Sequence, residues 1–232
     1  MDPLPFDVVV FDLDGTLADT APDLGAALNH ALQALGRAPV PLGSVRLMVG
    51  HGARALLRRA LAATGASSDA LVDAAIPHFM RFYADHICEG TRPYPRVEEA
   101  LQALDRAGAR LAVCTNKPER LARDLLQALG WQDRFRAVVG GDSLPARKPD
   151  PAPLLRAIAE AGGGAAVLIG DSITDAETAR AAGVPFLAVS FGFRDRPVEA
   201  LGAAAVIDRF DALLPALRAL GAATSSRGAV PA

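Results

Sequence analysis

Short apolar runs that alternate with helical periodicities constrain this chain more than any other feature of its sequence. Residues 8–11 form an apolar run between turn residues, which is typical of a strand buried on both faces. Similar runs predict further strands at 111–114, 137–139, 167–169, 186–189 and 206–207. Between these runs, apolar residues recur at helical spacing, as at Val97, Ala100, Leu101 and Leu104. This alternation predicts an α/β fold in which helices wrap both faces of a doubly wound, Rossmann-like parallel sheet.

One stretch breaks the alternation. Between residues 20 and 91 we expect no strand, and three helical stripes follow one another there. Two prolines, Pro93 and Pro95, then indicate a stiff return to the sheet. We therefore predict a core made of 1–19 and 92–221, with a second, smaller, all-helical domain of 20–91 inserted after the first strand. Residues 222–232 are small and polar, and we predict a disordered tail there.

Composition restricts the class of protein. The 232 residues are 51% hydrophobic and 22% charged, as in an ordinary globular protein. The net charge of −2 predicts no contact with nucleic acid or with an anionic membrane. The first residues lack the basic region of a signal peptide, and no apolar run approaches the roughly 18 residues of a membrane span. With Cys88 and Cys114 as the only cysteines, we expect buried or free thiols and a reducing, cytoplasmic location.

Polar residues follow directly after several of the expected strands. Because the carboxyl ends of parallel strands meet at one edge of a sheet, we expect these side chains to share one crevice. The segments concerned are Asp12-Leu13-Asp14-Gly15-Thr16, Thr115-Asn116, Lys148-Pro149, and Gly170-Asp171 with Asp175 after it.

This set of groups restricts the chemistry that the crevice can perform. Clustered carboxylates repel one another unless a cation lies among them, and carboxylate oxygens are preferred ligands of Mg²⁺. On the opposite side, Thr115 and Lys148 can hold an anion. An anion, a hard cation and a free carboxylate nucleophile describe phosphoryl transfer through an aspartyl-phosphate. Taken singly, each segment is more typical of a turn, a helix cap or a solvated lysine; their joint occurrence indicates a site.

These four segments resemble the motifs of the haloacid dehalogenase superfamily of phosphatases. The stretches 113–119 and 140–145 are similar to the phosphoglycolate phosphatase type, which carries an α-helical cap after its first strand. The resemblance covers roughly residues 6–220. It implies a Mg-dependent phosphoric monoester hydrolase that takes a small phosphomonoester, with 2-phosphoglycolate as the leading substrate, through an aspartyl-phosphate intermediate. The oligomeric state stays open.

The resemblance also implies roles for the acidic residues. Asp12 is expected to be the nucleophile and a metal ligand. Asp14 is expected to be the general acid and base, with its backbone carbonyl on the metal. Asp171 is the expected further carboxylate ligand, and Asp175 supports the metal directly, through water, or by pairing with Lys148.

The remaining candidate residues bind the substrate. The resemblance implies that Thr115, Asn116 and Lys148 hold phosphoryl oxygens, with Lys148 neutralising developing charge. In the expected cap, the glycine-flanked His51 and the nearby Arg54 open a helix whose free N–H groups suit an anion. We expect Arg54 to pair with a substrate carboxylate.

Several positions depart from the family pattern and leave the substrate open. Asparagine is common where His51 stands and glycine where Arg96 stands, and the segment 191–197 lacks the usual Asn/His/Gly-rich loop. A sugar phosphate or pyrophosphate therefore remains an alternative substrate.

Three further activities fit this sequence less well. Asp14 disfavours carbon–halogen cleavage, because family dehalogenases lack this aspartate. Thr16 disfavours a sugar-phosphate mutase, which more often carries valine at that position. A non-catalytic binding module would be expected to lose Asp12 or Asp171, and this chain keeps both.

Overall fold

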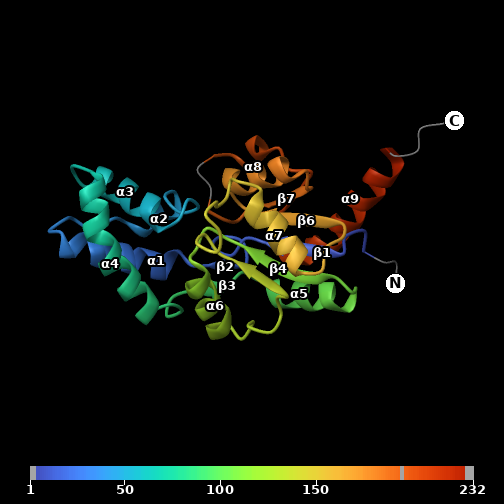
Figure 1. The fold of residues 1–232 in the computed structure, drawn as a ribbon, viewed down its shortest axis with the longest axis horizontal. Helices are drawn as coiled ribbons and strands as arrows, with labels where there is room; N and C mark the ends of the chain where they lie inside the picture. The colour runs from blue at the N-terminus through green and yellow to red at the C-terminus, as the bar shows by residue number, and fades with distance from the viewer. Residues whose placement is uncertain (1–3, 194–195, 228–232) are drawn as a thin grey trace.

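A parallel sheet with helices on both faces forms the larger part of the molecule (Figure 1). The computed structural model describes residues 4–193 and 196–227. Its main sheet has six strands in the order β5-β4-β1-β6-β7-β8, and every neighbouring pair is parallel. The strands are β1 (Val8–Phe11), β4 (Arg110–Cys114), β5 (Ala137–Val139), β6 (Ala166–Gly170), β7 (Phe186–Val189) and β8 (Ala205–Ile207). The predicted α/β class is confirmed.

The strand order creates a crevice beside the central strand. Val8 of β1 pairs with Arg110 of β4 on one side and with Ala166 of β6 on the other. From β1 the chain moves outward through β4 to β5, whereas from β6 it moves outward the other way through β7 to β8. Adjacent strands whose connections leave in opposite directions open a crevice at their carboxyl ends. In this chain the crevice lies where β1 and β6 end.

Alternation along β1 divides the core into two layers. Val9 and Phe11 belong to an apolar cluster with the helices α5, α6 and α9, while Val8 and Val10 belong to a second cluster with α7 and α8. These helices are α5 (Val97–Arg106), α6 (Glu119–Ala128), α7 (Ala152–Glu160), α8 (Ile173–Ala182) and α9 (Leu213–Arg227), with short 3₁₀ turns η1 (Val198–Leu201) and η2 (Phe210–Ala212). Within the described residues, every helix is too short or too polar to cross a bilayer.

A second group of helices lies beside the sheet, at the left of Figure 1. It consists of α1 (Ala21–Ala34), α2 (Leu42–Arg46), α3 (Ala53–Ala63) and α4 (Asp69–Asp85), all within the stretch predicted to be an insert. These helices bury their own apolar cluster, which includes Leu28, Leu57 and Phe79. The cluster also takes in Leu121 of α6, so apolar packing joins these helices, called the cap below, to the sheet layer.

A small antiparallel ribbon joins the two ends of the cap. Its strands are β2 (Ala18–Asp19) and β3 (Arg92–Pro93). Beside it, the buried carboxylate of Asp23 accepts hydrogen bonds from Gly90 N at 2.7 Å, Thr91 N at 2.8 Å and Thr91 Oγ1 at 2.6 Å. The chain therefore leaves and re-enters the sheet layer at one place. Two-residue strands carry no period of their own, so the sequence indicated only a stiff linker here.

Asp23→Ala is expected to lower the free energy of unfolding by about 2–4 kcal/mol, because three donors lose a buried charged acceptor. Urea denaturation followed by circular dichroism measures this change. Asp73→Ala is the matched control, because Asp73 lies on the exposed surface of α4, and it is expected to cost less than about 1 kcal/mol. Equal losses in the two variants would contradict the anchoring role of Asp23.

The predicted disordered tail is wrong over its first part. Helix α9 runs to Arg227, so 222–227 are helical. A helix that has already formed from Leu213 extends at little cost through alanine, which has the highest helix propensity. The rest of the predicted tail, 228–232, lies outside the described residues, as do residues 1–3 at the start of the predicted core.

Candidate active site

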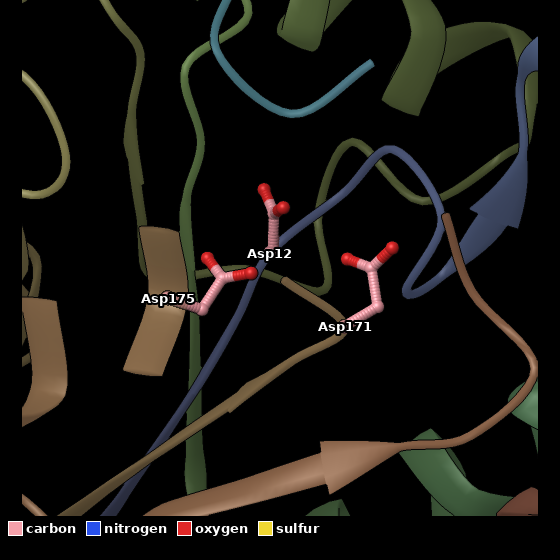
Figure 2. A group of neighbouring side chains, drawn as sticks. All are labelled: Asp12, Asp171 and Asp175. Atoms are coloured by element: carbon pink, nitrogen blue, oxygen red, sulfur yellow. The ribbon is translucent and has the colours of Figure 1, made fainter. Parts of the chain in front are cut away.

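Three buried carboxylates meet at the crevice. Asp12 follows β1, Asp171 follows β6, and Asp175 lies in the first turn of α8. One oxygen from each lies within 4.8 Å of the others, and Figure 2 shows the three side chains projecting toward a common space. The reversal in the direction of the strand connections thus brings together residues that are far apart in the sequence.

One ammonium group lies against this cluster. Lys148 Nζ is 3.0 Å from Asp12 Oδ1 and 2.6 Å from Asp175 Oδ1, and its side chain is only 1% exposed. Burial would lower the pKa of Lys148, but the two carboxylates outweigh burial and raise it, so the lysine stays charged.

The charges of the cluster do not balance without a further cation. Burial raises the pKa of Asp12 to about 6, and burial together with the neighbouring Asp175 and Asp12 raises the pKa of Asp171 well above its usual value. When all three carboxylates are ionised, one ammonium leaves two negative charges without a partner. Asp12 Oδ1 is also buried without a hydrogen bond, although Lys148 lies near it. A divalent cation bound by oxygen ligands fits this set of groups.

Neighbouring groups fix the orientation of Asp171. Its Oδ1 accepts a hydrogen bond from Thr16 Oγ1 at 3.0 Å, and its Oδ2 accepts one from Phe193 N at 2.5 Å. Gly15 passes so close that a Cβ there would collide with the carboxylate of Asp171, and its φ of +85° also favours glycine. The Asp-Gly-Thr segment therefore supports the second carboxylate as well as carrying Asp14.

Asp175 is tied to the protein at both oxygens. Its Oδ1 accepts from Lys148, while its Oδ2 accepts from Ser172 N at 3.1 Å and Ser172 Oγ at 2.6 Å. The bond from Ser172 N and a reciprocal bond from Asp175 N to Ser172 Oγ form a capping box at the start of α8. In this geometry Asp175 pairs directly with Lys148. This is one of the roles for Asp175 that the sequence left open.

Thr115 and Asn116 follow β4, as expected. Thr115 is buried and lines the space next to Asp12. The Asn116 amide nitrogen donates to Gly50 O at 3.2 Å and to Lys148 O at 3.1 Å. The side chain of Asn116 thus connects a cap loop with the segment that carries Lys148.

A small pocket lies between the carboxylates and the cap. Its cavity volume of about 50 Å³ holds roughly three to five waters. The cap and α6 contribute an apolar wall, made of Leu24, Val49, Leu56, Phe79, Met80 and Leu121. The polar lining consists of Asp12, Asp14, Thr115, Asn116, Lys117 and Tyr83. The pocket therefore places an apolar cap surface opposite the polar groups at the strand ends.

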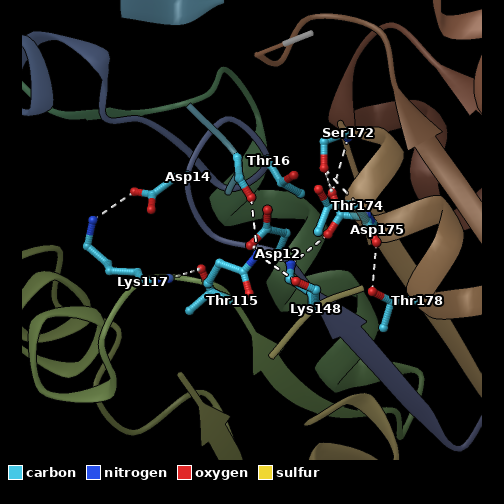
Figure 3. A network of polar contacts seen from close by, with 12 residues as sticks. Asp12, Asp14, Thr16, Thr115, Lys117, Lys148, Ser172, Thr174, Asp175 and Thr178 are labelled. Carbon is cyan, nitrogen blue, oxygen red and sulfur yellow. Dashed lines mark hydrogen bonds and ion pairs between the residues drawn. The ribbon is translucent and has the colours of Figure 1, made fainter. Parts of the chain in front are cut away.

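Two pocket residues were not predicted from the sequence. Lys117 Nζ lies 2.8 Å from Asp14 Oδ1 and 2.6 Å from Tyr83 Oη, and Figure 3 shows the contact with Asp14. Lys117 directly follows the predicted site residue Asn116, but a lysine just before a helix is ordinarily solvated. Tyr83 occupies an apolar stripe of α4 and gives no signal of its own.

The structure does not bring His51 and Arg54 into this pocket. Arg54 Nη1 pairs with Asp73 Oδ1 of α4 at 2.7 Å, and its side chain is 44% exposed. The buried face of α3 is formed by Leu56, Leu57, Ala60 and Leu61, so Arg54 is directed away from the substrate side. His51 Nδ1 lies 3.2 Å from Thr174 Oγ1 of α8 and joins the cap to the sheet layer. Neither residue is among those that line the pocket.

Two other expectations concern single residues. Cys114 is buried, and burial raises the pKa of its thiol to about 12, so the sulfur stays protonated. Arg96 has φ of 68°, a left-handed conformation that favours glycine. This explains why glycine is common at that position in the family that the motifs resemble.

Known proteins match this chain along most of its length. A family model described as haloacid dehalogenase-like hydrolase matches residues 9–189. A protein named phosphoglycolate phosphatase from Caulobacter vibrioides is 50% identical over 205 residues, which cover 87% of this chain and 86% of that protein. A protein of the same name from Mesorhizobium japonicum is 47% identical over 209 residues, covering 89% and 92%.

A solved structure agrees with these matches. The crystal structure of a predicted phosphoglycolate phosphatase from Haemophilus somnus superposes with a TM-score of 0.85 and 30% sequence identity. The superposition covers 91% of this chain and 97% of the other. It therefore includes the cap helices as well as the sheet.

Proposed function

Because the chain belongs to the haloacid dehalogenase-like hydrolase family, we propose that it hydrolyses 2-phosphoglycolate to glycolate and phosphate. The observation that carries the chemistry is the buried group of Asp12, Asp171 and Asp175 with Lys148 against it. The names of the relatives at 50% and 47% identity support the substrate.

The first half of the reaction transfers the phosphoryl group to Asp12. A carboxylate oxygen of Asp12 attacks phosphorus, and the bond from phosphorus to the ester oxygen breaks. Asp14, two residues further along the same loop, donates its proton to the leaving oxygen, and glycolate departs. Lys148, 3.0 Å from Asp12 Oδ1, neutralises charge on the phosphoryl oxygens and on Asp12.

The second half releases phosphate. Asp14, now ionised, takes a proton from a water molecule whose oxygen attacks the phosphorus of the aspartyl-phosphate. The bond between phosphorus and Asp12 breaks, which restores the carboxylate. The apolar wall from the cap limits the water that reaches the intermediate.

We propose that Asp12, Asp171 and the backbone carbonyl of Asp14 hold Mg²⁺, with Asp175 supporting the site through Lys148. A bound Mg²⁺ would neutralise the clustered carboxylates and the phosphoryl oxygens. Thr16 and Phe193 keep the Asp171 carboxylate in place for this purpose.

Removal of divalent ions is expected to lower the rate of phosphate release to background, because the phosphoryl oxygens and the clustered carboxylates then lack the cation that neutralises them. Exhaustive chelation followed by a phosphate-release assay measures this, and added Mg²⁺ should restore the rate. Full activity in the chelated protein would contradict a metal-dependent mechanism.

A panel of phosphomonoesters tests the substrate. We expect kcat/KM for 2-phosphoglycolate to exceed that for sugar phosphates and pyrophosphate by at least about 10-fold, since one buried charged contact contributes that much. A sugar phosphate or pyrophosphate with the higher kcat/KM would refute the substrate and leave the chemistry at Asp12 standing.

A further inference from the structure

Lys117 is a buried cation on the far side of the pocket from Lys148. Its side chain is 3% exposed, and from the loop after β4 it reaches Asp14 (Figure 3). It also contacts Tyr83 of the cap. Among the described residues that line the pocket, it is the one with a positive charge. An ammonium group buried in this way is costly unless it meets an anion, and Asp14 is the anion that the described residues supply.

The contacts of Lys117 and Tyr83 leave donors without acceptors. An ammonium group has three N–H donors, and within the described chain Lys117 uses two, on Asp14 Oδ1 and Tyr83 Oη. Tyr83 Oη accepts from Lys117, and its own proton has no acceptor among the described residues. One N–H and one O–H at adjacent atoms of the pocket lining therefore have capacity for an acceptor from a ligand.

The size of the proposed substrate restricts where its carboxylate can lie. In 2-phosphoglycolate a single methylene separates the ester oxygen from the carboxylate. Asp14 must contact the ester oxygen to protonate it. The group that binds the carboxylate must therefore lie next to Asp14, as Lys117 does at 2.8 Å. Arg54, whose charge pairs with Asp73 outside the pocket, does not meet this condition.

We propose that the Lys117 ammonium and the Tyr83 hydroxyl together bind the carboxylate of the substrate's leaving alcohol, and so select phosphorylated hydroxy acids over uncharged phosphomonoesters. This inference rests on the proposed function and names the residues that determine its specificity. Tyr83 belongs to α4 of the cap and Lys117 to the sheet layer, so the carboxylate would be bound only where the two layers meet. An uncharged alcohol would leave both donors unpaired.

The test compares two substrates of similar size, 2-phosphoglycolate and 2-hydroxyethyl phosphate, which lacks the carboxylate. The measured quantity is the ratio of their kcat/KM values, because loss of Lys117 also removes a partner of Asp14 and can slow both reactions. In Lys117→Met we expect this ratio to fall by about 10²-fold, as for a lost charged contact in a buried site. In Tyr83→Phe, which keeps the Lys117–Asp14 pair, we expect a fall of about 5- to 10-fold.

Arg58→Met is the matched control, because it removes one positive charge from an exposed position of the cap. Its ratio is expected to equal that of the wild-type protein. Thermal unfolding of each variant tests whether the fold is retained. If Lys117→Met does not fold, the substrate ratio of Tyr83→Phe decides the test.

The outcomes distinguish a failure of this inference from a failure of the proposed function. If the wild-type protein prefers 2-phosphoglycolate and Lys117→Met or Tyr83→Phe keeps that ratio, the carboxylate site is refuted and the proposed function stands. If Lys117→Met slows both substrates equally, Lys117 acts through Asp14 alone, which also overturns the inference. If the wild-type protein shows no preference between the two substrates, the proposed substrate and the carboxylate site are refuted together. Hydrolysis of both substrates in that case would still agree with phosphoryl transfer to Asp12.

Discussion

Asp12→Asn is expected to reduce kcat by at least about 10³-fold, to the background of the phosphate-release assay. An amide cannot form the aspartyl-phosphate, because its oxygen is a far weaker nucleophile than a carboxylate. The substitution changes almost no volume, so we expect the far-ultraviolet circular dichroism spectrum to match that of the wild-type protein. Lys148 keeps its contact with Asp175 in this variant.

The matched control for this loss is Asp150→Asn, since Asp150 is exposed next to the segment that carries Lys148. Its kcat is expected to stay within about 2-fold of the wild-type value. Asp12→Asn protein that keeps a tenth of wild-type kcat would show that another group attacks phosphorus.

Lys148→Met is expected to have the second largest effect, on activity and on stability together. The substitution leaves Asp12 and Asp175 facing each other in a buried site without their shared cation. Removal of one partner from a buried ion pair costs about 3–5 kcal/mol of unfolding free energy. We also expect kcat/KM to fall by at least about 10²-fold, because the phosphoryl charge loses its buried cation.

Urea denaturation and phosphate release measure the two losses separately. Arg147→Met is the control, because it removes the same charge from the adjacent, exposed residue. It is expected to change stability by less than about 1 kcal/mol and kcat/KM by less than about 2-fold. Near wild-type turnover in Lys148→Met would show that other groups neutralise the phosphoryl oxygens.

The sheet could be predicted from the sequence because both of its faces are covered. A strand buried on both sides needs apolar residues at every position, so β1 and β6 appear as continuous runs. The predicted strands differ from the observed ones by at most one residue at an end, since strand ends depend on hydrogen bonds that sequence does not show. The family was also predictable, because its motifs lie where these strands end.

The pocket could not be predicted in the same way, because it forms between two layers. The contact of Lys117 with Tyr83 requires the cap to lie over the loop after β4, and no local pattern specifies that arrangement. For Arg54 the sequence predicted a contact with the substrate that the structure does not show. Its place at a glycine-flanked helix start suggested an anion site, but the direction of its side chain follows from which face of α3 is buried.

The ribbon of β2 and β3 also affects the order in which the chain can fold. Pairing of Ala18 with Pro93 closes a loop that contains the whole cap, and closing a loop of this length costs on the order of 4 kcal/mol of chain entropy. The cap has its own apolar cluster, so part of that entropy is removed when its helices pack. A folded cap then reduces the connection between β1 and β4 to the ribbon and the crossover helix α5, whereas the strand pair otherwise joins residues about a hundred positions apart. The cap thus lowers the effective contact order of the central strand pair, and an exchange of one helical insert for another with equally close ends would leave the folding of the sheet unchanged.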